Sequence, residues 1–182
     1  MRKMILMKKN SGFTLMELMI VIAIIGITSA IAIPNFISWL PKNRMKSAAR
    51  DIYSTIQSAR IRAVKEGRRV VVDFNTGTGA AGTYNVFIDD GRGGGTPRDN
   101  TQNGNEPTIR SGQMPGDVNL YQANFGAGSW IRFDSRGRPN GVGGSARISN
   151  AGLNLFTGIF VRMTGTPDIR ISTNGGTTFL DS

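Results

Sequence analysis

The longest apolar run of the chain lies near its amino terminus and extends from Phe13 to Ile33, FTLMELMIVIAIIGITSAIAI. It contains one ionisable side chain, the carboxylate of Glu17. A helix of about 21 residues rises 1.5 Å per residue and covers roughly 30 Å, about the thickness of the hydrocarbon core of a bilayer. We therefore predict that residues 13–33 form a single membrane-spanning helix.

A helical pattern resumes beyond this run. Pro34 and Pro41 each remove a backbone donor, so we expect a kink or local unwinding there. Apolar or small residues then recur at steps of three and four, which places them on one helix face: Met45, Ala48, Ala49, Ile52, Ile56, Ala59 and Ala63. Basic residues occupy the opposite side: Lys46, Arg50, Arg60, Arg62 and Lys65. Gly67 provides a stop, so residues 34–67 are predicted to continue the helix and to pack on the rest of the chain.

The pattern changes to short strands over residues 68–182. Six stretches read as strands: 69–74, 83–89, 118–122, 130–134, 159–163 and 168–172. The first two should form a hairpin, and the alternation around Ile131 and Phe133 predicts one buried and one solvated face. Residues 91–117 are rich in Gly, Asn, Pro and charged side chains, which predicts a long mobile loop. The expected fold class is α+β, a long amino-terminal helix packed on an antiparallel sheet or a two-sheet body.

Composition narrows the chemistry. After residue 33 roughly 150 residues remain, enough for one globular domain, and 24 glycines and 7 prolines favour short strands and turns. The chain has no cysteine and no histidine, so disulfides, thiolate ligands and imidazole ligands are excluded. Asp89, Asp90 and Asp99 lack the ligand spacing of a calcium loop. We expect no metal, no cofactor and no enzymatic activity, because no carboxylate pair is placed by a recognisable motif.

A glycine motif in the first hairpin does not change this expectation. Gly77, Gly79 and Gly82 spell GxGxxG after a strand. A dinucleotide-binding fold requires a helix at the next position, and the sequence here predicts a second strand.

The charge is strongly positive. The formal net charge is +10, and loss of the four basic residues within positions 1–12 would lower it to +6. A positive net charge favours anionic partners, namely nucleic acid, phospholipid headgroups or an acidic neighbouring subunit. The net charge alone does not distinguish among these three. Four basic residues follow the span, Lys42, Arg44, Lys46 and Arg50, so the positive-inside rule does not orient it.

The segment KKNSGFTLMELMIVIAIIG resembles the processing site and first helix of type IV pilins and type II secretion pseudopilins. The resemblance implies that a prepilin peptidase cleaves after Gly12, removes residues 1–12 as a basic leader and methylates the amine of Phe13. It also implies that Glu17 pairs with the terminal amine of a neighbouring subunit. A lone carboxylate in hydrocarbon costs about 2.5–3.5 kcal/mol or more, which independently requires a partner or protonation, unless Glu17 lies close enough to the interface to snorkel.

The order of one long helix followed by short strands, without a carboxyl-terminal cysteine pair, resembles the H-type pseudopilins and FimT-like minor pilins. Residues 133–139 are similar to a Phe-x-x-x-Gly segment of such domains. This resemblance implies a single-pass protein of the bacterial inner membrane with its domain on the exterior side. It further implies a minor pilin or pseudopilin that an inner-membrane platform assembles with other subunits into a type IV pilus or a type II secretion pseudopilus.

The alternative function is that of a DNA-binding minor pilin acting in DNA uptake. It is motivated by the positive charge and by arginines among the strands: Arg132, Arg136, Arg138, Arg147, Arg162 and Arg170. FimT-like members bind DNA through a carboxyl-terminal Gly-Arg-x-Arg element, where this chain reads Gly-Thr-Pro-Asp at residues 165–168. Residues 137–140, Gly-Arg-Pro-Asn, preserve only the first half of that element, so the resemblance does not transfer DNA binding.

Overall fold

The computed structural model describes residues 12–126, 128–139, 143–172 and 174–181. Of the leader expected over residues 1–12, only Gly12 falls within the described residues. The chain divides into two compact units, residues 1–40 and residues 41–182.

One helix, α1 (Leu15–Glu66), runs through the boundary between the two units. No unwound turn interrupts it at Pro34 or Pro41, so of the two alternatives expected there local unwinding is excluded, and a kink stays a prediction. The fixed φ of proline is compatible with a helix, and each proline removes one backbone N–H donor. Next to Pro34, the side-chain amide of Asn35 donates to the carbonyl of Ile31 at 3.1 Å.

The first unit exposes its apolar side chains. Phe13 is 87% exposed and Leu15 is 77% exposed, and the large apolar residues that follow are exposed as far as Trp39. The helix contains an 18-residue window of mean hydropathy 2.4, none of it buried within the chain. By length and composition this segment can cross a membrane.

The second half of α1 buries one face inside the second unit. Every residue predicted for the apolar face is buried: Met45, Ala48, Ala49, Ile52, Ile56, Ala59 and Ala63. The helix ends as predicted at Gly67, whose φ of 63° lies in the left-handed region. Its N–H donates to the carbonyl of Val64 at 3.3 Å, and the N–H of Arg68 donates to that of Ala63 at 3.2 Å, the pair of bonds of a Schellman cap.

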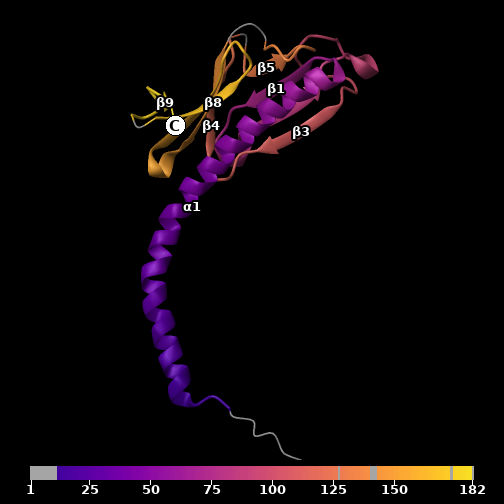
Figure 1. The fold of residues 1–182 in the computed structure, drawn as a ribbon. Helices are drawn as coiled ribbons and strands as arrows, with labels where there is room; N and C mark the ends of the chain where they lie inside the picture. Colours follow the sequence, from indigo (N-terminus) through magenta and orange to yellow (C-terminus); the bar gives the residue numbers. More distant parts are fainter. Residues whose placement is uncertain (1–11, 127, 140–142, 173, 182) are drawn as a thin grey trace, which may run out of the picture. The chain divides into compact units, whose positions relative to one another are not determined.

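The strands of the second unit form two antiparallel sheets (Figure 1). The first sheet has the order β3-β2-β1-β5, formed by β1 (Val70–Asn75), β2 (Thr83–Ile88), β3 (Thr108–Gln113) and β5 (Trp130–Phe133). The second has the order β4-β6-β7-β8-β9, formed by β4 (Asn119–Asn124), β6 (Gly144–Asn150), β7 (Leu155–Val161), β8 (Pro167–Ser172) and β9 (Leu180–Asp181). Short 3-10 turns are η1 (Gly79–Ala81), η2 (Arg92–Gly94) and η3 (Ala151–Leu153). The predicted α+β class with a two-sheet body is confirmed.

One hydrophobic core joins the apolar face of α1 to both sheets. In the first sheet it contains Val72 of β1, and in the second Ile148 of β6 and Ile159 of β7, all fully buried. The rings of Phe74 and Phe125 stack with their centroids 5.5 Å apart. Because the same core holds both sheets and the helix, residues 41–182 form one packed unit.

Six strands lie where the sequence pattern predicted them, and each end agrees to within four residues. The β1–β2 hairpin is confirmed, with Val70 opposite Ile88 and Asn75 opposite Thr83. The alternation in β5 is confirmed as well, since Ile131 and Phe133 are buried. Strands β3, β6 and β9 were not predicted, and β3 lies inside residues 91–117, so the expectation of a loop throughout that segment was wrong.

The segment between β2 and β3 is organised by two buried carboxylates. Asp89 accepts a hydrogen bond from the backbone N–H of Asn100 at 3.2 Å. Glu106 accepts from the N–H of Gly91 at 2.8 Å and from that of Asn103 at 3.1 Å. The polar composition therefore supplies partners for the backbone of this connection, which apolar side chains could not do.

Candidate functional site

The predicted processing junction lies immediately before α1. Gly12 and Phe13 are both exposed and non-helical, and among the described residues nothing beyond its chain neighbours lies within 4 Å of a Cβ built at Gly12. Leu15 is the first helical residue. Gly12 and Phe13 thus lie outside the helix that follows them.

Thr14 begins the helix. Its hydroxyl accepts a hydrogen bond from the N–H of Glu17 at 3.2 Å, and its carbonyl accepts from the N–H of Leu18, also at 3.2 Å. This is the amino-terminal half of a capping box, in which a Ser or Thr precedes a Glu by three residues. The Thr-x-x-Glu spacing would have revealed the role of Thr14 from sequence, but the predicted set of site residues did not include it.

Glu17 occupies the first turn of α1 with its side chain exposed. A carboxylate in the first turn faces the positive end of the helix dipole. Among the described residues, the Glu17 carboxylate takes part in no hydrogen bond or ion pair with any other side chain or backbone group. Within the described part of the chain, the Glu17 carboxylate thus has no partner.

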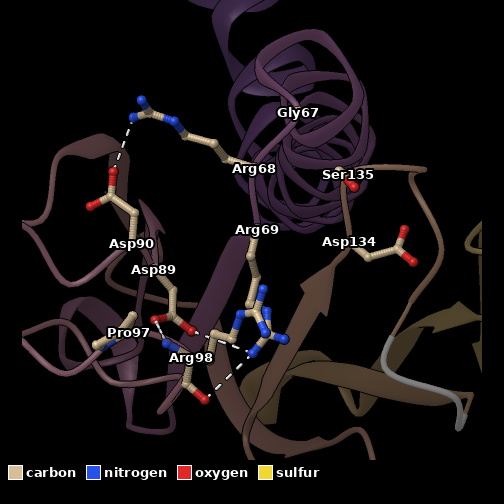
Figure 2. Close-up of a pocket in the computed structure, with 9 residues that line it drawn as sticks. All are labelled: Gly67, Arg68, Arg69, Asp89, Asp90, Pro97, Arg98, Asp134 and Ser135. Atoms are coloured by element: carbon tan, nitrogen blue, oxygen red, sulfur yellow. Dashed lines mark hydrogen bonds and ion pairs between the residues drawn. The ribbon is translucent and has the colours of Figure 1, made fainter.

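An open cleft of about 610 Å³ lies in the second unit where the chain leaves α1 and enters β1 (Figure 2). Its lining is dominated by ion pairs. Arg68 contacts Asp90 at 3.0 Å, and Arg69 contacts Asp89 at 3.8 Å. Arg69 also donates to the backbone carbonyl of Arg98 at 3.4 Å. In each pair the charges of the arginine and the carboxylate neutralise one another. These ion pairs connect the segment after β2 to the start of β1.

The electrostatics of this region agree with a structural role. Burial lowers the pKa of Arg69, with the nearby Arg132 acting in the same direction and Asp89 opposing it. At the other side of the cleft, burial would raise the pKa of Asp134, but hydrogen bonds from the backbone N–H groups of Arg138 and Arg136 outweigh it and lower that pKa. The carboxylate of Asp134 turns away from Asp89 and Asp90 in Figure 2.

The acidic residues considered for calcium serve other purposes. The carboxylate of Asp89 accepts from backbone N–H groups, and that of Asp90 contacts Arg68 and Arg92. Asp99 accepts from the side-chain amide of Asn103 at 2.6 Å. Over the described residues, no three acidic side chains gather in a group that could hold a metal ion.

The arginines considered for DNA binding do not gather on one sheet. Arg132 belongs to β5 of the first sheet, where its guanidinium lies over the ring of Trp130 at 5.6 Å. Arg147 belongs to β6 of the second sheet and lies over the ring of Phe179 at 5.0 Å. Arg138 pairs with Asp134, and both Arg162 and Arg170 pair with Asp168. Most of these cations are thus engaged within the domain.

Comparison with known proteins identifies the family. Residues 48–178 match the family described as type II transport protein GspH, and residues 7–33 match the prokaryotic N-terminal methylation motif. The chain belongs to the GspH family. The GspH match covers α1 from Ala48 onward and strands β1 to β8, and the methylation motif covers the predicted cleavage junction and span.

Curated relatives are pilins. A fimbrial protein of Pseudomonas aeruginosa is 43% identical over 65 residues, which is 36% of this chain and 42% of that protein. The type IV major pilin protein PilA of Myxococcus xanthus is 60% identical over 40 residues, 22% of this chain and 18% of that protein. The chain thus spans less than half the length of these relatives.

Solved structures share the fold of the domain. The type IV minor pilin FimU of Pseudomonas aeruginosa aligns with a TM-score of 0.50 at 14% identity, over 75% of this chain and 98% of FimU. A second crystal form of FimU gives a TM-score of 0.51 at 15% identity, over 78% of this chain and 96% of FimU. The predicted class, a type IV pilin or pseudopilin of the GspH and FimT type, is confirmed.

Proposed function

We propose that this chain is a minor pilin or pseudopilin, a structural subunit that acts by assembly and not by catalysis. Residues 13–33 anchor it in the bacterial inner membrane, and the domain lies on the exterior side until the subunit enters a filament. Its partners are a prepilin peptidase, other pilin subunits, the inner-membrane assembly platform and membrane lipid.

The observation that carries the proposal is the presence of a methylation motif and a GspH domain in one chain, joined by a helix with an exposed apolar half. An exposed apolar surface of this extent requires lipid or neighbouring subunits to cover it. In a structural subunit that moves from the membrane to a filament, lipid covers this surface first and neighbouring subunits cover it afterwards.

Processing would occur between Gly12 and Phe13. The motif spans the junction, and the junction is exposed and non-helical. Cleavage there would remove the basic residues of positions 1–12 and leave Phe13 as the new amino terminus, four residues before Glu17.

In this proposal, Glu17 binds the terminal amine of a neighbouring subunit. Its carboxylate has no partner among the described residues, and hydrocarbon penalises it by about 2.5–3.5 kcal/mol when it stays unpaired. The protonated, N-methylated terminal amine of a neighbouring subunit would supply the compensating charge and hydrogen bond.

The decisive experiment compares the chain expressed with and without a prepilin peptidase, by intact mass and amino-terminal fragmentation. We expect a peptidase-dependent product that begins at methylated Phe13. A chain that keeps residues 1–12 in both samples would overturn the processing step and indicate an ordinary signal-anchored exterior domain. A Gly12→Ala variant tests the site itself, and cleavage at another bond in that variant would reassign the junction.

A further inference from the structure

Three basic residues form a row on α1 at the start of the second unit. Lys42, Lys46 and Arg50 follow one another at steps of four residues, so they lie on one face of the helix. All three side chains are exposed. We refer to these three residues as the basic row.

The basic row is unpaired, unlike the cations around it. Arg44, on the same stretch of helix, contacts Asp117 at 3.5 Å, and farther along Arg62 contacts Glu66. No residue of the basic row contacts a carboxylate or donates a side-chain hydrogen bond within the described part of the chain. Like charges four residues apart on a helix repel one another, and an external anion bound to the basic row would relieve this repulsion.

A groove beside the basic row adds an apolar surface. Lys46 and Arg50 line it on the helix side, and Ile169 and Ile171 of β8 line it on the sheet side. Its volume is about 210 Å³, and Ile171 is 41% exposed. The charged ends of Lys46 and Arg50 thus lie beside an exposed isoleucine side chain. This arrangement suits a partner whose surface carries negative charge and whose interior is apolar.

The position of the basic row in the chain brings its first member, Lys42, near the membrane surface. The exposed apolar stretch continues to Trp39, a residue type enriched where hydrocarbon meets headgroups. Lys42 follows three residues later, and a fully extended chain covers at most about 3.6 Å per residue, so Lys42 lies within about 11 Å of Trp39 whatever the conformation between them. That is about one Debye length at 0.1 M salt.

We propose that the basic row binds the headgroups of anionic phospholipids and holds the membrane-resident subunit against the bilayer surface. A second copy of this chain is a poorer occupant, because its net charge is also positive and its described carboxylates are mostly paired. Membrane-proximal basic clusters gain about 1 kcal/mol per cation at an anionic surface, about a fivefold preference for each. The inference rests on the anchoring step of the proposed function and not on cleavage or filament assembly.

The test uses the full chain in nanodiscs of equal parts phosphatidylglycerol and phosphatidylcholine, followed by mild detergent extraction and native mass spectrometry of the retained lipid. The variant is K42Q/K46Q/R50Q. The matched control is K65Q/R98Q/R136Q, which removes the same charge from exposed cations that also lack an ion pair in the described residues. We expect the native chain and the control to retain phosphatidylglycerol preferentially, and the basic-row variant to lose at least about fivefold of that preference.

Equal lipid preference in the basic-row variant and the control would overturn the proposal. If the variant keeps its lipid preference but loses cross-linking to neighbouring subunits, the basic row is a subunit contact and the lipid assignment is wrong. Raising the salt to about 1 M, where the Debye length is about 3 Å, should reduce the native preference toward that of the variant. Peptidase cleavage, measured on the same three proteins, reports separately on the proposed function.

Discussion

The two halves of α1 show how one helix can serve two environments. In the first unit, apolar side chains from Phe13 to Trp39 are exposed all around the helix. In the second unit, residues such as Ile52 and Ile56 are fully buried on one face, while charged residues occupy the other. The second half finds its apolar partner within the chain, and the first half requires lipid or neighbouring subunits.

Because of this difference, we expect the residues needed for membrane insertion and assembly to lie in the first half of α1 and those needed for the stability of the domain to lie in the second half. Substitutions in the first half should alter insertion or assembly and leave the domain intact. Substitutions on the buried face of the second half should unfold the domain. Four experiments sharpen that division.

The largest effect is expected for Glu17→Ala. If Glu17 pairs with the terminal amine of a neighbour, its loss leaves that amine unpaired and should reduce incorporation into filaments by about 100-fold, the equivalent of the 2.5–3.5 kcal/mol cost of an unpaired group. Incorporation is measured by quantitative immunoblotting of sheared filaments. Thr28→Ala is the control, because the Thr28 hydroxyl already donates to the Ile24 carbonyl of its own helix at 2.9 Å. Normal incorporation of the Glu17→Ala variant would exclude the pairing.

A smaller but still large effect is expected for Ile52→Ala. Ile52 is 0% exposed within the shared core, and truncation of a buried Ile to Ala costs about 2–5 kcal/mol. The matched substitution Ile24→Ala in the first half should leave the unfolding free energy of the domain unchanged. Both are measured by denaturation of the full chain in detergent, followed by tryptophan fluorescence. Similar losses for the two variants would show that the halves are not separate.

A moderate effect is expected for Gly67→Ala at the end of α1. The left-handed backbone of Gly67 costs an L-residue about 1–2 kcal/mol, although no atom lies within 4 Å of the added Cβ. Gly116→Ala is the control, because its Cβ also meets open space and its backbone lacks a positive φ. Equal stability of the two variants would mean that the Schellman cap does not constrain this end of the helix.

The smallest effect is expected for Asp73→Asn on β1. Burial raises the pKa of Asp73, and the hydrogen bond from Ser129 only partly opposes that shift. A pKa raised in the folded state means that the contribution of Asp73 to stability is fully present below its unfolded pKa and is lost as the pH rises through the folded pKa. Asp73→Asn should therefore stabilise the domain by under about 1 kcal/mol at pH 7 and make little difference below about pH 3. Unfolding curves at the two pH values check this, and destabilisation at pH 7 would contradict it.

The sequence predicted elements whose pattern is local and apolar. The buried face of α1 and the alternation of Ile131 and Phe133 follow directly from periodicity, and Gly67 from its place after a periodic run. The sequence pattern did not predict β3, because β3 is an edge strand whose six residues are all partly or fully exposed. The pattern also did not predict β6. In that strand Ala146 and Ile148 are the two buried apolar residues, and their neighbours along the strand are polar.

The candidate site divides in the same way. Gly12, Phe13 and Glu17 were predicted from a contiguous motif, and the N-terminal methylation motif matches residues 7–33. The cap at Thr14 was missed although its spacing was visible in sequence. The pairing of Arg69 with Asp89 and the groove between the basic row and β8 could not be predicted. Arg69 and Asp89 flank two different strands, and the groove brings together a helix and a strand that is distant in sequence.

By itself, the sequence determined that this protein has an apolar helix long enough to span a bilayer, a processing motif before it and an amphipathic helix after it. These properties depend on residues within a few turns of one another, so neighbouring side chains specify them. The tertiary structure decided the order of the strands in the two sheets. It also decided that Asp89 and Glu106 bind the backbone of the segment before β3, and which cations lack an ion pair among the described residues. Those outcomes depend on contacts between distant residues, which only the folded chain brings together.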